Sequence, residues 1–462
     1  MSGTIQIVNP ATGRPISSYD AWDAVRIEAA VERAHDAWRA WAPAPVAERA
    51  ARAADLARVL REHKGQLAEL TATEMGKPVG EAEAEVEKSA LTAEYYAGQG
   101  PGILADEHVS AVEGADAWVA YEPMGLVLAV MPWNFPVWQV MRFAIPSLVA
   151  GNGVLLKHAS NVTGSALALQ DVFAKAGFPE HLVTALVVAD ADVPDVTARL
   201  IEDDRVAAVT LTGSNRAGAA VGAAAGRAAK KSVLELGGSD AFVVLDDADV
   251  EAAAAAAVRA RFTNSGQSCV CAKRFIVAEA VADAFITAFV RGVEALRIGD
   301  PRERSTQVGP LARDDLRTAI ARQVEQSVAL GARLLTGGRP LPGEGWFFQP
   351  TVLVDTGPGM PAFDEETFGP LAAVTVARDD DEAVRLAEAS VFGLGLSVWT
   401  ADTRRGVALA RRVTSGAAFV NAVVASDPRV PFGGTKRSGY GRELAAAGIR
   451  EFTHTRTYWV AR

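Results

Sequence analysis

A cysteine and a glutamate are the side chains of this sequence best suited to covalent chemistry. Cys269 follows a Gly-Gln pair in the run 264–271, which also holds the only other cysteine, Cys271. Glu235 precedes a Leu-Gly-Gly run and lies 34 residues upstream. Because the thiolate is the reactive form of cysteine, a nucleophilic thiol needs a polar, partly exposed setting and a base. We interpret Cys269 as the nucleophile and Glu235 as its base, against the alternative of a small buried cysteine.

A turn between a predicted strand and a predicted helix could hold phosphate. The run 212–218, Thr-Gly-Ser-Asn-Arg-Ala-Gly, places Gly213 and Ser214 where the helix begins. Free N–H groups and the positive end of the helix dipole favour an anion there. The run is neither the dinucleotide fingerprint Gly-x-Gly-x-x-Gly nor a Walker loop. An ordinary strand–helix turn is therefore the alternative.

Lys157 ends a short apolar run that is typical of a buried strand. Open α/β sheets bind ligands at the carboxyl ends of their strands. We therefore expect Lys157 near the ligand of the turn at 212–218. A surface lysine at a strand end is the alternative.

The elements that must position these residues alternate between strands and helices. Residues 1–100 are helical in pattern, at 25–42, 46–75 and 80–98, and a strand-rich stretch, 117–131, follows. Further strands are predicted at 153–157, 182–188, 206–211, 232–236, 241–245 and 274–277, and further helices at 163–176, 215–229, 250–262 and 281–296. Such alternation indicates an α/β fold built on parallel sheets. A domain boundary is expected near Gly237, and the late strand 451–460 is expected to pair with another segment or subunit.

Composition narrows the classes of function. The chain has 462 residues, enough for about two to four domains. A net charge of -10 without a basic block argues against nucleic acid as a partner. Two cysteines so close together form no disulfide framework, which indicates a reducing, cytoplasmic setting, and the first 20 residues have no signal-peptide pattern. The histidines are scattered, so no metal is expected. The apolar stretch 123–156 is interrupted by three prolines and favours a buried strand, loop and helix over a membrane span.

Five motifs occur in one order along nearly the whole chain. They are Pro-Trp-Asn-Phe-Pro at 132–136, Glu-Leu-Gly-Gly at 235–238, Gly-Gln-Ser-Cys at 266–269, Glu-Thr-Phe-Gly-Pro at 366–370 and Pro-Phe-Gly-Gly at 431–434. Together they resemble the aldehyde dehydrogenase superfamily. The resemblance implies a Rossmann-type parallel-sheet cofactor domain, 1–103 with 124–236, and an α/β catalytic domain, 237–435. It also implies a small β oligomerisation arm, 104–123 with 450–462, and hence a homodimer or homotetramer.

The resemblance implies a role for each motif residue. Cys269 would attack an aldehyde to give a thiohemiacetal and then a thioester, with the oxyanion held by Asn134 and the Cys269 N–H. Glu235 would activate the hydrolytic water, and Glu443 would be a second acid, with a structural ion pair to an arginine as its alternative. Coenzyme-A-acylating members generally lack a glutamate at this place, so Glu235 favours a free acid as the product. The implied cofactor-binding residues are Lys157, Ser160, Gly213, Ser214, Trp133, Glu366 and Phe368.

Ser160 bears on the choice of cofactor. NAD-preferring members often hold a glutamate three residues after the lysine, where it bonds a ribose hydroxyl and repels a phosphate. Serine does neither, so NADP is the expected cofactor, with NAD possible.

Arg142 bears on the substrate. It is the only charge in the stretch 123–156, and a buried cation needs an anion. The surrounding segments most resemble bacterial succinate-semialdehyde dehydrogenases, in which an arginine at this place binds the substrate carboxylate. A structural Asp or Glu is the alternative partner, and Thr263 stands where some members have a second arginine. The implied substrate-binding residues are Arg142, Phe135, Trp138, Ser426 and Phe432.

Two other functions compete with succinate-semialdehyde oxidation. One is a broad-specificity aldehyde dehydrogenase for uncharged aldehydes, and the other is a cysteine hydrolase that uses Cys269 and Glu235 without a cofactor. The Cys-x-Cys pair also resembles family members that close a disulfide under oxidation; simple packing of Cys271 is the alternative.

Overall fold

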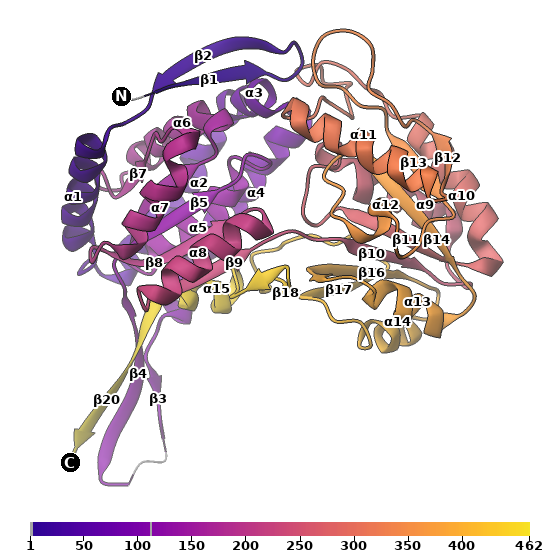
Figure 1. Ribbon diagram of the computed structural model, residues 1–462. Coiled ribbons are helices and arrows are strands. Elements are labelled where there is room, and N and C mark those ends of the chain that lie inside the picture. The colour runs from indigo at the N-terminus through magenta and orange to yellow at the C-terminus, as the bar shows by residue number, and fades with distance from the viewer. Residues whose placement is uncertain (1–2, 111–112) are drawn as a thin grey trace.

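Two sheets, each covered by helices on both faces, make up the body of this computed structural model, which describes residues 3–110 and 113–462 (Figure 1). The first sheet has the order β19-β9-β8-β5-β6-β7 and is parallel except for its edge strand β19. Its strands are β5 (Leu126–Met131), β6 (Gly153–His158), β7 (Val183–Ala185), β8 (Val206–Thr212), β9 (Lys231–Glu235) and β19 (Gly439–Tyr440). Their nearly continuous apolar residues are buried because helices lie on both faces.

Helices from the first half of the chain supply those two faces. One apolar core joins the sheet to α2 (Val46–Glu62), α4 (Val79–Ile103), α5 (Trp138–Val149) and α6 (Thr163–Lys175). The core on the opposite face involves α1 (Ala24–Trp41), α7 (Val193–Glu202) and α8 (Asn215–Arg227). Also in this half are α3 (Lys64–Met75), the 3-10 turns η1 (Ser160–Val162) and η2 (Asp190–Asp192), and α15 (Ala445–Glu451) from the far end of the chain.

The second sheet has the order β12-β13-β14-β11-β10-β16-β17 and is parallel except for β12. Its strands are β10 (Asp240–Val244), β11 (Ala272–Ala278), β12 (Arg333–Thr336), β13 (Thr351–Val354), β14 (Leu371–Ala377), β16 (Gly395–Trp399) and β17 (Ala417–Val420). Its helices are α9 (Val250–Phe262), α10 (Glu279–Glu294), α11 (Asp314–Ala329), α12 (Pro361–Asp364), α13 (Asp380–Glu388) and α14 (Thr403–Ala410). A short pair, β15 (Phe392–Gly393) with β18 (Thr435–Lys436), lies beside it.

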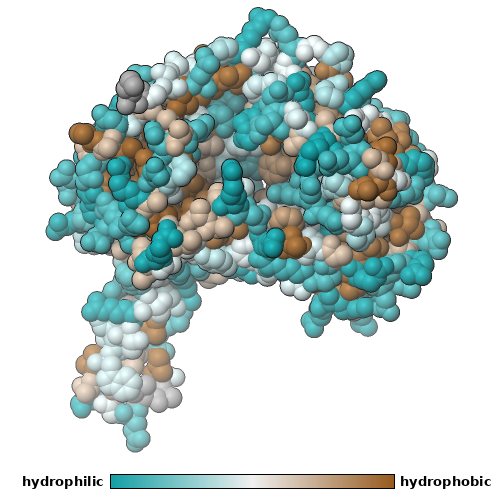
Figure 2. All heavy atoms as spheres, viewed as in Figure 1, coloured by the Kyte–Doolittle hydropathy of each residue, from teal (hydrophilic) through white to brown (hydrophobic). Residues whose placement is uncertain are grey.

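The chain passes between the two sheets twice. β9 ends at Glu235 and β10 begins at Asp240, so four residues separate the sheets. After β17 the chain returns and adds β19 to the edge of the first sheet. The carboxyl end of β9 therefore faces the amino end of β10, and the surface is hollowed between the two halves (Figure 2).

A three-stranded antiparallel sheet projects from the body at the lower left of Figure 1. It consists of β3 (Glu107–His108), β4 (Ala115–Pro123) and β20 (Thr453–Ala461), and β20 pairs with β4 along its whole length. The Trp118 and Tyr458 rings stack at 5.0 Å on it. The late strand predicted at 451–460 thus has its partner in the same chain.

Three predictions of local structure are corrected. The first hundred residues are not all helical, because β1 (Thr4–Asn9) and β2 (Arg14–Asp20) form a hairpin. In β1, alternate residues such as Ile5 and Ile7 are buried, which is the strand period. The helix predicted at 46–75 is two helices that break at His63, and the strand predicted at 182–188 extends only over β7, while α7 was not predicted at all.

Candidate active site

Cys269 lies in a tight loop between α9 and β11. The turn η3 (Thr263–Gly266) that opens this loop has left-handed backbone at Asn264 (φ 53°), Ser265 (φ 55°) and Gly266 (φ 76°). Left-handed backbone is strained in non-glycine residues and persists only where the surroundings hold it. At Gly266 a Cβ would lie 2.4 Å from the Gly369 oxygen, which explains the glycine.

Lys273 holds the backbone at Ser268 and Cys269 in place. Its buried Nζ donates to the carbonyl oxygens of Ser268, at 3.0 Å, and Cys269, at 2.8 Å. The same ammonium is 3.7 Å from Glu366, whose Oε1 accepts a hydrogen bond from the Gly238 N–H at 3.0 Å. One lysine therefore links the nucleophile loop to the motif at 366–370.

A second buried cation, Arg261, holds the other end of the loop. Its guanidinium donates to the carbonyl oxygens of Gly266, at 3.3 Å, Thr367, at 3.0 Å, and Gly369. The two motifs that contain Cys269 and Glu366 are thus fixed relative to each other by carbonyl contacts. Lys273 and Arg261 were not predicted, because no neighbouring residue marks a charged side chain in β11 or in the last turn of α9 as buried.

The two glycines after Glu235 allow the sheets to meet at the site. A Cβ on Gly238 would lie 2.6 Å from the Cys269 carbonyl oxygen, and one on Gly237 would lie 2.5 Å from Glu366. Real side chains do not tolerate such distances. The glycines of the Glu-Leu-Gly-Gly motif therefore allow the segment of Glu235 to approach the Cys269 loop and Glu366 closely.

Asn134 lies directly over the nucleophile loop. Its Nδ2 donates to the Gln267 backbone carbonyl at 3.1 Å, and its own backbone carbonyl accepts from the Asn264 side chain at 2.8 Å. The residue is buried yet lines the same cavity as Cys269. An amide nitrogen has two N–H groups, so one is left to face that cavity.

Glu235, Glu443 and Arg142 form a buried cluster of two acids and one cation. The Arg142 Nε is ion-paired with Glu443, and its Nη2 donates to the Thr212 hydroxyl at 3.3 Å. The Arg142 guanidinium lies over the Phe432 ring, with its central carbon 4.6 Å from the ring centre. The structural ion pair that was considered as the alternative for Arg142 and for Glu443 is therefore present. Binding of a substrate carboxylate by Arg142 stays a prediction.

Burial controls the proton affinities at the site. Burial, helped by the negative charge of Glu443, raises the pKa of Glu235 well above its usual value, and burial raises the pKa of Glu443. Burial also raises the pKa of Cys269 to about 12, although the charges of Arg142 and Lys273 oppose this. The thiol is therefore protonated at neutral pH and needs a base.

Four cavities follow one another through the molecule and share wall residues. The largest, about 700 Å³, lies between α7 and α8 and includes Lys157, which also lines the second, of about 620 Å³. Trp133 and Arg313 line both the second and a third of about 260 Å³. Cys269 and Gln139 line both the third and a fourth of about 200 Å³. Cys269 thus lies where two cavities meet.

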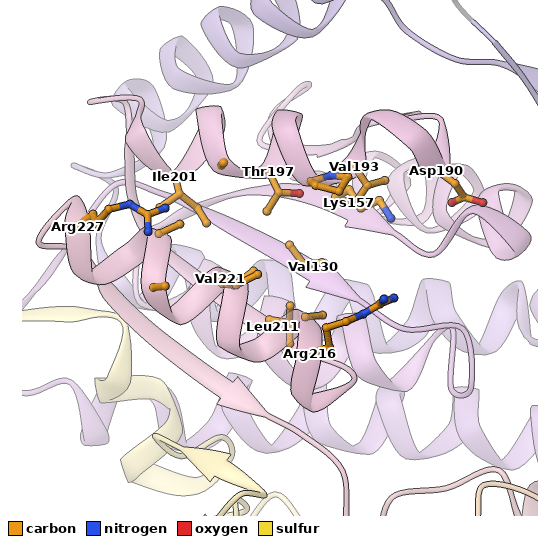
Figure 3. Close-up of a pocket in the computed structure, with 16 residues that line it drawn as sticks. Val130, Lys157, Asp190, Val193, Thr197, Ile201, Leu211, Arg216, Val221 and Arg227 are labelled. Atoms are coloured by element: carbon orange, nitrogen blue, oxygen red, sulfur yellow. The ribbon is translucent and has the colours of Figure 1, made fainter.

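The predicted cofactor-binding residues all line the first three cavities. Figure 3 shows Lys157, Asp190 and Arg216 near one end of the largest cavity and Arg227 at the other. Ser160 lines the second cavity, and Ser214 caps α8 through a 3.3 Å bond from the Ala217 N–H. The remaining predicted residues line the third cavity: Trp133, Gly213, Ser214, Glu366 and Phe368. The rings of Trp133 and Phe368 meet edge to face at 5.7 Å.

The predicted substrate-binding residues all line the fourth cavity, and they are Arg142, Phe135, Trp138, Ser426 and Phe432. Two cations that sequence analysis missed, Lys88 and Arg259, line it as well. Thr263 also lies in its wall. Helix periodicity could have marked Lys88 on the face of α4 that carries Glu81 and Glu85.

The second cysteine packs against the loop. Both cysteines are free thiols, and Cys271 is buried with its Sγ 3.7 Å from the Thr263 carbonyl. Over residues 3–110 and 113–462, no group of three or more His, Cys, Asp or Glu side chains could hold a metal ion. Within the same ranges, no helix has the length and apolar character to cross a membrane.

A comparison with known protein families tests the resemblance to the aldehyde dehydrogenase superfamily. The model of the aldehyde dehydrogenase family matches residues 1–458. This chain belongs to the aldehyde dehydrogenase family. The family resemblance and the α/β fold that it implied are thus confirmed.

Similar proteins refine the comparison. The chain is 48% identical over 452 residues to the succinate semialdehyde dehydrogenase [NAD(P)+] Sad of Escherichia coli strain K12, with 98% of this chain and 97% of the relative covered. It is 47% identical to succinate-semialdehyde dehydrogenase [NADP(+)] 1 of Mycobacterium ulcerans strain Agy99, with 99% of each covered. The crystal structure of the Streptococcus pyogenes succinic semialdehyde dehydrogenase with NADP+ matches with a TM-score of 0.95 at 32% identity, covering 99% of this chain and 100% of that one.

Proposed function

We propose that this enzyme oxidises succinate semialdehyde to succinate with NADP. The observation that carries the proposal is the position of Cys269 at the junction of two cavities, one lined by cofactor-site residues and one by aromatic and cationic side chains. The similar proteins named succinate-semialdehyde dehydrogenases support it over nearly the full length of the chain. The cofactor-independent hydrolase and the broad-specificity alternative are not favoured.

The residues of the first three cavities fit a dinucleotide. The amino end of α8, with Ser214 at its cap, suits a pyrophosphate, and Lys157 suits the adenosine ribose or its phosphate. Glu366 would hold the nicotinamide ribose, and Phe368 would pack on the ring. When bound, NADP supplies the nicotinamide that accepts hydride from the substrate carbon.

Cys269 is the proposed nucleophile. Glu235, in its ionised form, takes the proton of the thiol, and the sulfur bonds to the aldehyde carbon, which becomes a thiohemiacetal with its oxygen as the oxyanion. The free N–H of Asn134 and the Cys269 backbone N–H would stabilise the oxyanion; one such donor is typically worth roughly 3–4 kcal/mol of barrier. Loss of hydride from that carbon leaves a thioester on Cys269.

Glu235 is the proposed base for hydrolysis. In its ionised form it takes a proton from water, which attacks the thioester, releases succinate and returns the thiol. Its raised pKa suits this role because a stronger base accepts the proton more readily. Glu443, held by Arg142, is proposed to tune Glu235 through its charge, and it could relay the proton onward.

We also propose the larger organisation implied by the family. The first sheet and its helices, 1–103 with 124–236, would be the cofactor domain, and 237–435 the catalytic domain. The projecting sheet, 104–123 with 450–462, would join subunits into a homodimer or homotetramer. Two free thiols in the active-site loop suit a cytoplasmic, reducing setting.

A panel of aldehydes tests the function. Reduction of NADP and of NAD would be followed at 340 nm with succinate semialdehyde and with uncharged aldehydes, for the wild type and for Cys269→Ala. We expect the highest kcat/KM with succinate semialdehyde and NADP, and no activity in the variant. Equal rates with uncharged aldehydes would refute the substrate, and activity in Cys269→Ala would refute the mechanism.

A further inference from the structure

The fourth cavity holds three cations that differ in what already neutralises them. Arg142 is paired with Glu443, and its guanidinium lies over Phe432. Arg259 is exposed on α9 and donates to a carbonyl oxygen of its own helix at 3.3 Å. Lys88 lies between these cases, because it is partly buried and, among the described residues, has no carboxylate within 4.0 Å. A buried or half-buried charge without a counter-ion is costly, so Lys88 is suited to pair with an anionic ligand.

The surroundings of Lys88 orient its ammonium group into the cavity. Its Nζ is 2.7 Å from the hydroxyl oxygen of Ser426 and 4.3 Å from the centre of the Trp138 ring. All three residues line the fourth cavity together with Cys269. Since the ammonium donates to the Ser426 oxygen, the Ser426 hydroxyl proton is free to donate to a second acceptor. Two donors from different segments therefore converge on one point of the wall.

The charges around Lys88 favour an anion at this point. Burial and the positive charge of Arg142 lower the pKa of Lys88 to about 8, while the acids Glu85 and Asp427 and the thiol of Cys269 act in the opposite direction. Asp427 is engaged by Arg429 at 2.7 Å, and Glu85 by Lys77. A carboxylate bound between Lys88 and Ser426 would add the negative charge that these occupied acids do not supply.

We propose that Lys88, together with the hydroxyl of Ser426, binds the distal carboxylate of the aldehyde substrate and is the specificity-determining cation of this site. The proposal rests on the proposed oxidation of a semialdehyde at Cys269 and deepens it. Arg142, already paired with Glu443, then shapes the cavity wall and the electrostatics of the two acids. Aromatic walls at Phe135 and Phe432 enclose the carbon chain between the two ends of the substrate.

The test compares a charged with an uncharged substrate of the same chain length. Purified wild type, Lys88→Met and Lys88→Arg would be assayed with succinate semialdehyde and with butanal under the same cofactor. Loss of one charge-assisted hydrogen bond lowers the ratio of the two kcat/KM values by about 10- to 100-fold. We expect this fall in Lys88→Met, mainly through KM for succinate semialdehyde, and a partial recovery in Lys88→Arg.

Arg259→Met is the matched control, because Arg259 is the other cation of the same cavity that has no carboxylate partner among the residues the structure describes. We expect it to leave the ratio within about twofold of the wild type, as for an exposed charge screened by solvent. A ratio unchanged in Lys88→Met, or a larger fall in Arg259→Met, would overturn the role of Lys88 while the proposed function stands. A wild type that oxidises butanal and not succinate semialdehyde would overturn both the proposed substrate and this inference.

Discussion

At the residue scale, the site buries more acidic side chains than basic ones. Glu235 and Glu443 both lie in the field of the Arg142 guanidinium, and all three side chains are almost fully buried, whereas Arg442, which also acts on Glu235, is partly exposed. Two acids and one cation cannot all be ionised without cost in a low-dielectric interior. The proton therefore distributes over the two acids, and the pKa of the base depends on the charge of its neighbour.

Replacing Glu443 tests that coupling. The negative charge of Glu443 raises the pKa of Glu235, so Glu443→Gln lowers it. The ionised base then exists at lower pH, and the acid limb of the pH profile of kcat is expected to move to lower pH. Glu74→Gln is the control, because Glu74 is another buried acid with a pKa of about 7. A limb that stays in place in Glu443→Gln, or moves equally in the control, would contradict the coupling.

A substitution at Ser160 tests the proposed preference for NADP over NAD. A glutamate in its place would put a negative charge in the cavity that Lys157 lines, and would repel a ribose phosphate. We expect Ser160→Glu to lower the ratio of kcat/KM for NADP to that for NAD by at least about 10-fold, the equivalent of 1.4 kcal/mol. Gln6→Glu, in the wall of the same cavity, adds the same charge elsewhere and should change the ratio far less.

At the element scale, one face of α4 serves three parts of the site. Glu81 accepts a hydrogen bond from the Asn264 N–H of the nucleophile loop at 2.6 Å. Glu85, one turn later, accepts from the N–H groups of Val137 and Trp138 at 2.8 Å each, and so caps α5. Lys88 follows on the same face. The i, i+4, i+7 spacing aligns these charges, so one rigid helix fixes the loop, α5 and the cavity wall.

Replacing Glu85 tests how much the contacts of α4 contribute to the stability of the fold around the site. It is also the counter-ion of the fully buried Lys77, whose ammonium lies 3.6 Å from the centre of the Phe135 ring. Removing one partner of a buried pair typically costs about 3–5 kcal/mol, so Glu85→Gln should clearly lower the thermal midpoint. Glu87→Gln, on the solvent side of the same helix, should cost less than about 1 kcal/mol. Equal midpoints for the two variants in calorimetry would contradict this account.

At the scale of the whole molecule, the projecting sheet has little apolar core of its own. Most side chains of β20 are exposed, including Trp459 at 62% and Val460 at 50%. Figure 2 shows apolar side chains among polar ones along this sheet. An isolated sheet of three strands needs an apolar face covered to be stable, which is the physical reason to expect a second subunit there.

Charged substitutions test the assembly. We expect Trp459→Asp combined with Val460→Asp to shift sedimentation from an oligomer toward a monomer, because the new carboxylates would be desolvated in an interface. Val25→Asp places one new carboxylate on an exposed apolar residue of α1 and should leave the mass of the sedimenting assembly unchanged. A wild type that sediments as a monomer would contradict the proposed role of this sheet.

The sequence alone determined the family and much of the local structure. Short motifs led to the proposed roles of Cys269, Glu235 and Asn134, and the alternation of strands and helices predicted the α/β sheets because side-chain period depends only on neighbouring residues. The hairpin β1–β2 was not predicted, because a short pair of strands gives a weaker periodic pattern than the long helices that follow it.

Only the tertiary structure decided which charges meet. Arg142 needed an anion, yet nothing in the sequence selects Glu443, 301 residues away, from 56 acidic residues. Lys88 looks like any charge on a helix until folding places it beside Ser426 and Trp138 in the cavity of Cys269. The reason is physical: residue type and spacing fix local conformation and reactivity, while the pairing of buried charges depends on how distant elements pack.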